Sequence, residues 1–307
     1  MSPSPRSAAT AVAPRALRWP WWRALRPHHW AKNLLVFVPA IAAHRYGDTT
    51  TMLAALTMFV ALGLAASAIY LVNDIGDRDA DRRHPRKRLR PFAAGELAPR
   101  AGAALATVLV VAAAVLVAAA LPRAALIVLA AYVLVALAYS IRLKRWAGVD
   151  VAVLAVLYTL RVVAGGAAIG VAVTPWLLAL SLALFASLAL AKRHAEVAET
   201  ADVDSARVPG RGYQRNHLGR LRAAGLATAV LAALIIALYA ASDDGARNYA
   251  QPFWLYALSL VVACWLVRVW RRASDGRMHD DPVVDAATDP PGLAIVALGA
   301  ALFVAAL

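Results

Sequence analysis

The sequence contains a single cysteine, Cys264, which excludes an intrachain disulfide and any cysteine-based metal cluster. Acidic residues are also scarce, because 18 Asp and Glu stand against 32 Lys and Arg and the formal net charge is +14. Such a charge can indicate nucleic-acid binding. Here 62% of the residues are hydrophobic and the mean hydropathy is +0.62. We therefore attribute the positive charge to cytoplasmic loops, anionic lipid and phosphate groups, and expect no nucleic acid as partner.

The N-terminus lacks the features of a cleaved secretory signal, since residues 1–20 have no compact apolar core and no clear cleavage site. These residues are small, basic and contain several prolines, so we expect a disordered tail. Residues 21–307 are expected to form one membrane domain. Arginines alternate with tryptophans between residues 15 and 30, which is typical of a segment that lies among lipid headgroups.

Apolar runs of about 20 residues recur along the chain, the length that crosses a bilayer as a helix. They predict an all-α polytopic membrane protein built as a bundle of nine transmembrane helices. The expected spans are 28–45, 52–72, 103–121, 124–141, 149–172, 174–191, 222–241, 252–270 and 290–307.

The distribution of basic residues predicts the orientation of this bundle. With a cytoplasmic N-terminus, the inner segments are 1–32, 73–102, 142–148, 192–222 and 268–289, and they hold 28 of the 32 Lys and Arg residues. Positive charge concentrates on the cytoplasmic side of membrane proteins. We therefore expect a multi-pass protein of the cell membrane whose second and sixth spans lead into long cytoplasmic loops.

An acidic stretch ends the second expected span. On a helix, Asp74, Asp77 and Asp81 stand at i, i+3 and i+7 and share one face, with Asn73 beside Asp77. Hard oxygen ligands of this kind suit Mg²⁺, and the basic residues of 82–91 suit phosphate groups. The plain alternative is a solvated helix end, but such a cluster is unusual at the end of a membrane span.

Two further features lie near the expected span ends. Lys32 and Asn33 begin the first span, where they could contact phosphate or simply snorkel and cap. Tyr139, Arg142 and Lys144 close the fourth span, where cations also suit a helix C-terminus and an ordinary positive-inside cluster.

Two more lie deeper in the chain. Arg161 falls inside a span, so we expect it to line a wet cavity or to pair with an acid. Lys192, Glu196 and Glu199 share one helical face after the sixth span, and Arg193 lies next to Lys192. They form either a local i, i+4 ion pair between Lys192 and Glu196 or a second polar cluster across the cytoplasmic mouth. Asp280 and Asp281 are expected to be surface or capping residues rather than ligands.

Carboxylates, many cations and an apolar bundle at one membrane face suit a reaction between a phosphorylated soluble substrate and a lipid. Mg²⁺ would neutralise a diphosphate leaving group, and the cations would hold the remaining phosphates. The residues alone do not name the lipid or the head group.

The pattern Asn73-Asp74-x-x-Asp77-x-x-x-Asp81 resembles the first Asp-rich motif of the UbiA-type intramembrane prenyltransferase superfamily. Within it, residues 24–290 are most similar to the decaprenyl-phosphate phosphoribosyltransferases. The stretches that carry the likeness are Arg26-Pro27-x-x-Trp30-x-Lys32-Asn33, Asn73 to Pro91, Ala94-Gly95, Tyr139-Ser140-x-x-Leu143-Lys144, Leu160-Arg161-x-x-Ala164-Gly165-Gly166, Lys192-Arg193-x-Ala195-Glu196 and Met278-His279-Asp280-Asp281-Pro282-Val283.

The resemblance implies a nine-helix bundle with a cytoplasmic active site. It implies that phosphoribosyl pyrophosphate binds with Mg²⁺ at Asp74, Asp77 and Asp81, and that its phosphoribosyl group passes to a polyprenyl phosphate such as decaprenyl phosphate during cell-wall arabinan (arabinogalactan) precursor synthesis. A homo-oligomer is compatible with this assignment. The implied substrate-binding residues are Lys32, Asn73, Arg82, Lys87, Arg88, Arg90, Tyr139, Arg142, Lys144, Arg161, Lys192, Arg193 and Glu196.

The sequence departs from ordinary prenyltransferases after the sixth span. Those carry a second Asp-rich motif there, whereas this chain reads Lys192-Arg193-His194-Ala195-Glu196. The departure fits the phosphoribosyl branch, in which the diphosphate belongs to the sugar donor. Two alternatives stay open: a prenyltransferase that moves a prenyl group from its diphosphate to an aromatic or other acceptor, and a transporter or lipid-binding scaffold without turnover.

Overall fold

The computed structural model describes residues 20–85, 87–200, 212–278 and 289–307, and all regular structure in these ranges is helical. Seven of the described helices are long and apolar enough to cross a membrane. They are α3 (Thr49–Gly76), α5 (Pro99–Ala120), α6 (Arg123–Ile141), α7 (Val149–Ala168), α8 (Pro175–Thr200), α9 (Leu218–Ala240) and α11 (Phe253–Ser274). By their length and composition, these helices indicate a multi-pass membrane protein.

The first and last expected spans differ from the prediction. Residues 28–45 do not form one helix, because a 3₁₀ helix, η1 (Pro27–Phe37), is followed by the short α2 (Val38–Ala42). Pro39 has no amide hydrogen and cannot extend the hydrogen-bond ladder of the preceding turn. The last span is α13 (Pro290–Ala306), an apolar helix of 17 residues. The prediction of nine long spans is therefore not confirmed, and the orientation of the chain in the membrane stays a prediction.

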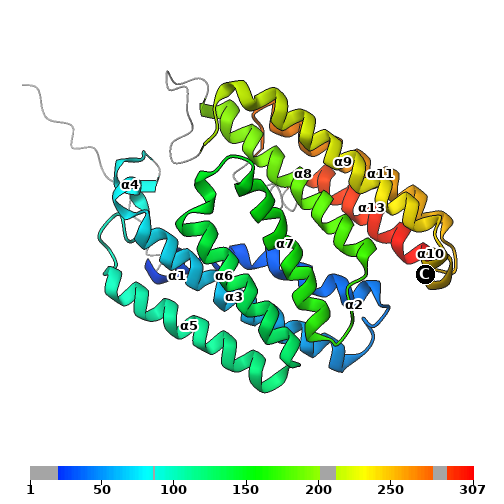
Figure 1. The fold of residues 1–307 in the computed structure, drawn as a ribbon, viewed down its shortest axis with the longest axis horizontal. Coiled ribbons are helices and arrows are strands. Elements are labelled where there is room, and N and C mark those ends of the chain that lie inside the picture. Colours follow the sequence, from blue (N-terminus) through cyan, green and yellow to red (C-terminus); the bar gives the residue numbers. More distant parts are fainter. Residues whose placement is uncertain (1–19, 86, 201–211, 279–288) are drawn as a thin grey trace, which may run out of the picture.

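The shorter elements gather at the ends of the long helices. They are α1 (Pro20–Leu25), α4 (Arg78–Arg83), η2 (Lys87–Leu89), η3 (Leu143–Arg145), η4 (Arg215–His217) and α10 (Asp243–Asn248). In Figure 1, α4 lies at the opposite end of the molecule from α10 and the C-terminus. The end that carries α4 also carries the polar residues of the site.

Helix α7 lies between two groups of helices (Figure 1). The helices α3, α5 and α6 lie on one side, and α8, α9, α11 and α13 lie on the other. Apolar side chains on the outside of the bundle, including Val108, Val111, Ile127 and Leu134, are exposed. A soluble domain would bury such residues, whereas a bilayer solvates them.

Close backbone contact joins η1 to α7. A Cβ atom at Gly165 would lie 2.0 Å from the backbone oxygen of Val36, so only glycine fits there. Small residues permit this approach of helices in a membrane. The contact brings Asn33 of η1 to Arg161 of α7.

Candidate active site

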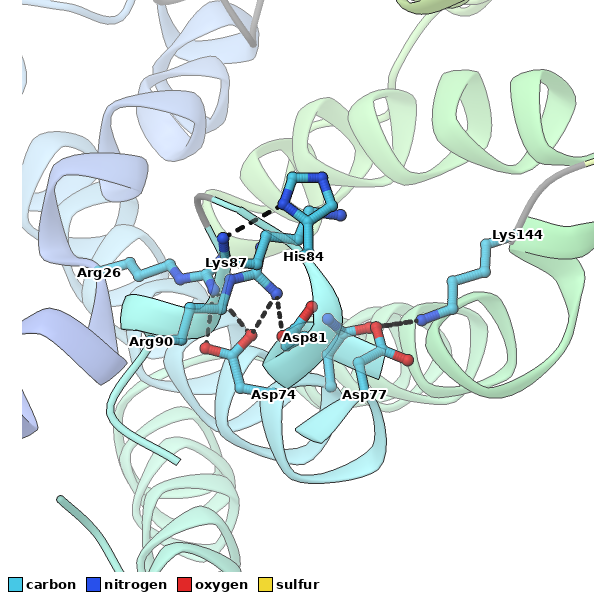
Figure 2. A network of polar contacts seen from close by, with 9 residues as sticks. Arg26, Asp74, Asp77, Asp81, His84, Lys87, Arg90 and Lys144 are labelled. Carbon is cyan, nitrogen blue, oxygen red and sulfur yellow. Dashed lines mark hydrogen bonds and ion pairs between the residues drawn. The ribbon is translucent and has the colours of Figure 1, made fainter. Parts of the chain in front are cut away.

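The acidic stretch spans a break between two helices. Helix α3 ends at Gly76, α4 begins at Arg78, and Asp77 lies at the junction with φ −91° and ψ 2°. The expectation of one continuous helical face is therefore wrong, because the break turns Asp77 away from Asp74 and Asp81. Figure 2 shows the three carboxylates pointing in two directions.

Asp74 and Asp81 are buried and bound by arginines. Both carboxylate oxygens of Asp74 accept from Arg26 Nη2 at 2.7 Å. Arg90 Nη1 joins the pair, since it lies 3.2 Å from Asp74 Oδ1 and 2.7 Å from Asp81 Oδ2. Arginine therefore occupies the space between these two carboxylates (Figure 2).

Asp77 faces the opposite side of the junction and contacts Lys144. Lys144 Nζ donates to Asp77 Oδ2 at 2.7 Å and to Asn73 Oδ1 at 3.0 Å. The Asp77 side chain is 33% exposed, whereas that of Asp74 is 1% exposed. Asp77 is therefore the carboxylate of the three that a solute can reach.

A cavity of about 540 Å³ lies beside this junction, between α3, α6, α7, α8 and η1. The structure brings most of the predicted substrate-binding residues to its wall. These are Lys32, Asn73, Asp77, Lys87, Arg90, Tyr139, Lys144, Arg161, Lys192, Arg193 and Glu196.

The other predicted residues lie outside the cavity wall. Asp74 and Asp81 are not in the wall but are paired with Arg26 and Arg90, which are. Arg82 Nε donates to the backbone oxygen of Ala93 at 3.1 Å, and Arg142 lies over the ring of Trp146. Arg88 is exposed. Asp280 and Asp281 are outside the described residues.

Arg193 is a buried cross-link between helices rather than a free cation. Its Nε donates to Asp150 Oδ2 at 2.5 Å, Nη1 donates to Glu196, and Nη2 donates to the Tyr139 hydroxyl at 3.0 Å. Tyr213 also donates to Asp150, and its hydroxyl accepts from Gly148 N at 2.8 Å. Burial, together with the hydrogen bond to Asp150, raises the Tyr213 pKa, so this hydroxyl stays protonated as a donor.

Arg161 forms one end of the cavity. Its Nε donates to Asn33 Oδ1 at 3.0 Å, its Nη2 to the Tyr132 hydroxyl at 2.9 Å, and its Nη1 to the Leu157 backbone oxygen at 2.7 Å. The guanidinium also lies 5.0 Å from the ring centroid of Tyr132 and 5.1 Å from that of Tyr158. Arg161 thus lines the cavity, and its role in binding a substrate stays a prediction.

Several lining residues were not predicted from the sequence. The pattern assigned Arg26 to an interfacial segment, but it holds Asp74 and lies 5.0 Å from the Tyr70 ring centroid. Asp150 opens α7 and could be read only as a first-turn acid. For an aromatic residue in an apolar helix, the sequence alone does not show whether the ring lines a cavity or packs in the core. Asp150 itself is not part of the cavity wall, and the unpredicted lining residues with ring side chains are His28, His29, Tyr70, Tyr132 and Tyr158.

The oxygen ligands at the cavity wall suit an Mg²⁺ ion that is bound partly by the protein and partly by a substrate phosphate. Among the described residues, no group of three or more His, Cys, Asp or Glu side chains converges as a metal cage. Mg²⁺ usually takes one or two carboxylates and completes its shell with water and substrate phosphates. Asp77 and Asn73 supply such oxygens at the cavity wall, where they now bind Lys144 Nζ. They would hold the ion together with a diphosphate.

The fold and the site together define a polytopic membrane protein with a polar, cationic cavity inside its helical bundle. The sequence model of the UbiA prenyltransferase family matches residues 33–283. The chain therefore belongs to the UbiA prenyltransferase family and is a membrane transferase, which confirms the resemblance found in the sequence.

Three relatives differ in how much of their length this chain covers. An uncharacterized protein y4nM of Sinorhizobium fredii is 38% identical over 94% of this chain, which spans 56% of that protein. Nodulation protein NoeC of Azorhizobium caulinodans is 34% identical over 91% of this chain and 90% of its own length. Decaprenyl-phosphate phosphoribosyltransferase of Mycolicibacterium smegmatis is 35% identical over 63% of this chain and 62% of its own length.

A solved structure shows the same fold. The UbiA homolog from Archaeoglobus fulgidus bound to DMAPP and Mg²⁺ superposes with a TM-score of 0.69, covering 93% of this chain and 98% of that chain. The identity is 17%, so this likeness concerns the fold alone.

Proposed function

We propose that the protein transfers the 5-phosphoribosyl group of phosphoribosyl pyrophosphate to a polyprenyl phosphate such as decaprenyl phosphate, and releases pyrophosphate. The observation that carries this proposal is the charge of the cavity wall. Two lining side chains are carboxylates, Asp77 and Glu196, whereas the lining cations are Arg26, Lys32, Lys87, Arg90, Lys144, Arg161, Lys192 and Arg193.

Carboxylates outside the wall, Asp74, Asp81 and Asp150, balance part of this excess, and the remaining positive charge suits the proposed substrates. Phosphoribosyl pyrophosphate carries a diphosphate and a 5′-phosphate, and the lipid acceptor adds a third phosphate group. A prenyl diphosphate with an uncharged aromatic acceptor brings one charged group. Lys192 and Arg193 line the wall where a second Asp-rich motif would lie in an ordinary prenyltransferase, which favours the reaction with more phosphates.

The relatives support the proposal without deciding it. The M. smegmatis relative is named for this reaction, and the names of the relatives from S. fredii and A. caulinodans give no reaction. The chain spans 62% of the M. smegmatis protein. We therefore only propose the reaction of that relative for this chain. The same holds for a role in cell-wall arabinan synthesis.

The reaction forms a bond between a lipid phosphate oxygen and the anomeric carbon as the bond to the diphosphate breaks. Ribosyl transition states have oxocarbenium character, so stabilising the leaving group and aligning the reactants supply most of the rate. Mg²⁺ held by Asp77 and Asn73 would supply charge neutralisation for the diphosphate. Lys144 and Lys192 would contact the phosphates, and a general base is unnecessary because the lipid phosphate is already an anion.

Asp74 and Asp81 act indirectly in this proposal. Their ion pairs fix Arg26 and Arg90, both of which line the cavity. Side chains that are held in place before the substrate arrives stabilise charge more effectively than mobile ones. The proposed location is the cell membrane, with the cavity open to the cytoplasm where a soluble sugar phosphate is available.

The test uses purified protein in detergent with labelled phosphoribosyl pyrophosphate, decaprenyl phosphate and Mg²⁺. We expect a labelled lipid that disappears with EDTA and in Asp77→Asn, and that persists in Arg142→Gln, which removes a cation outside the cavity. Folded wild-type protein that labels no lipid from this donor, but joins a prenyl diphosphate to an aromatic acceptor, would replace the proposal with a prenyltransferase.

A further inference from the structure

Arg161 lies much deeper in the bundle than the acidic junction. It is twelve residues beyond Val149, the first residue of α7, which corresponds to about 18 Å along the helix axis. Asp150, at the same end of α7 as Val149, belongs to the polar cluster around Arg193. The cavity therefore extends from the Asp77 end to a second polar group near the middle of a membrane span.

The charge of Arg161 has no counter-charge in the part of the chain that the structure describes. Its three hydrogen bonds go to an amide, a phenol and a backbone carbonyl, all of which are neutral. The other lining arginines differ, since Arg26, Arg90 and Arg193 each form an ion pair with a carboxylate. The tyrosine rings over the guanidinium attract a cation but carry no net charge.

Unused donors accompany the unbalanced charge. A guanidinium has five N–H groups, and the three hydrogen bonds of Arg161 leave one N–H on each Nη atom. Asn33 is 1% exposed, and its Nδ2 has no hydrogen-bond partner. The Asn33 amide orientation is fixed because its oxygen accepts from Arg161. Buried donors without acceptors are rare in native structures, so the polar group around Arg161 has hydrogen-bonding capacity that the described residues do not use.

We propose that Arg161, held in place by Asn33, forms a binding subsite for a phosphate monoester at the deep end of the cavity, separate from the diphosphate site at Asp77. A monoester has several acceptor oxygens on one anionic group, which can engage both Nη atoms together. Tyr132 positions the guanidinium through its hydroxyl. The monoester is the 5′-phosphate of the sugar donor or the phosphate of the lipid acceptor, and this choice rests on the proposed function.

The experiment compares two pairs of probes on purified protein. Ribose 5-phosphate is tested against ribose, and farnesyl phosphate against farnesol, by equilibrium binding and by the shift in unfolding temperature. We expect the phosphorylated member of one pair to bind the wild type. We expect Arg161→Gln to weaken that binding at least tenfold and Arg142→Gln to leave it unchanged.

A second variant tests the charge itself. Asn33→Asp places a carboxylate beside the guanidinium and would satisfy Arg161 from within the chain. It should raise the unfolding temperature without ligand and abolish the response to the phosphorylated probe. A purely structural role for the pair predicts no change in probe binding. Asn33→Asp also serves if Arg161→Gln does not fold.

The probe that responds identifies which phosphate occupies the subsite. Failure of both phosphorylated probes to bind the wild type, or equal binding by wild type and Asn33→Asp, would overturn the subsite. Wild-type protein that binds a probe through Arg161, but transfers no phosphoribosyl group to decaprenyl phosphate, would leave the subsite standing and remove the proposed reaction.

Discussion

Lys144 Nζ lies 2.7 Å from Asp77 Oδ2 and occupies the position that a cation would take beside the accessible carboxylate of the site. The same ammonium contacts Asn73 Oδ1 at 3.0 Å. A metal ion at this site would compete with Lys144 for the same two oxygens. Such competition would link metal binding to substrate binding, because an arriving diphosphate would offer Lys144 a new anionic partner.

We predict that Lys144→Met raises the affinity of the substrate-free protein for Mn²⁺, used as a probe for Mg²⁺. Removing the competing ammonium should strengthen binding by about tenfold, or about 1.4 kcal/mol, as measured by electron paramagnetic resonance of free Mn²⁺. Turnover should fall at the same time, because the phosphates lose a contact. Unchanged Mn²⁺ affinity would show that Asp77 and Asn73 do not bind the metal. Arg142→Gln is the control.

Substitution of Asp77 should lower turnover, whereas substitution of Asp74 should lower the stability of the fold. Asp77→Asn should reduce turnover by at least about 100-fold, comparable with the loss of a key transition-state contact, while the unfolding temperature stays near the wild-type value. Its side chain is 33% exposed, so the fold depends little on it. A folded Asp77→Asn protein that retains activity at saturating Mg²⁺ would contradict this role.

Asp74→Asn should instead destabilise the protein. It leaves Arg26 and Arg90 without a shared, buried carboxylate, and breaking a buried ion pair costs about 3–5 kcal/mol. Arg90 keeps its partner Asp81, so we expect a value near the lower end of that range. Thermal unfolding in detergent measures it. Equal unfolding temperatures for Asp74→Asn and Asp77→Asn would show that Asp74 is not a structural anchor.

The sequence indicated which residues gather at the cavity, but it did not indicate how the acidic residues are arranged there. Cations such as Lys144 and Lys192 were identifiable because charges at span ends and within spans stand out against an apolar background. The turn at Asp77 was not identifiable, because the helical spacing of the acidic residues continues through the motif although α3 ends at Gly76. Nothing in the sequence indicated that Arg90 would bridge Asp74 and Asp81, since such a contact requires the chain to fold back.

The buried ion pair between Arg193 and Asp150 gives a prediction about the stability of the protein. Asp150→Asn removes the carboxylate that Arg193 Nε contacts at 2.5 Å, while the Arg193 side chain is 1% exposed. A buried charge that loses its partner costs about 3–5 kcal/mol. Glu196 still contacts Arg193, so the protein should fold with a lower unfolding temperature. Tyr213→Phe is the milder comparison, with an expected cost of about 1 kcal/mol for one hydrogen bond.

The contact between η1 and α7 gives a matched pair of glycine substitutions. Gly165→Ala forces a Cβ to within 2.0 Å of the Val36 backbone oxygen, whereas a Cβ at Gly219 of α9 meets nothing within 4 Å. Gly165→Ala should cost about 1–3 kcal/mol through overpacking and should disturb phosphate-probe binding, because η1 carries Asn33. Gly219→Ala should be neutral or stabilising by up to about 1 kcal/mol, as alanine is the better helix former. Thermal unfolding of both variants tests the pair. Equal stabilities would show that η1 can withdraw from α7 without cost, and that Asn33 is not held against Arg161 by this contact.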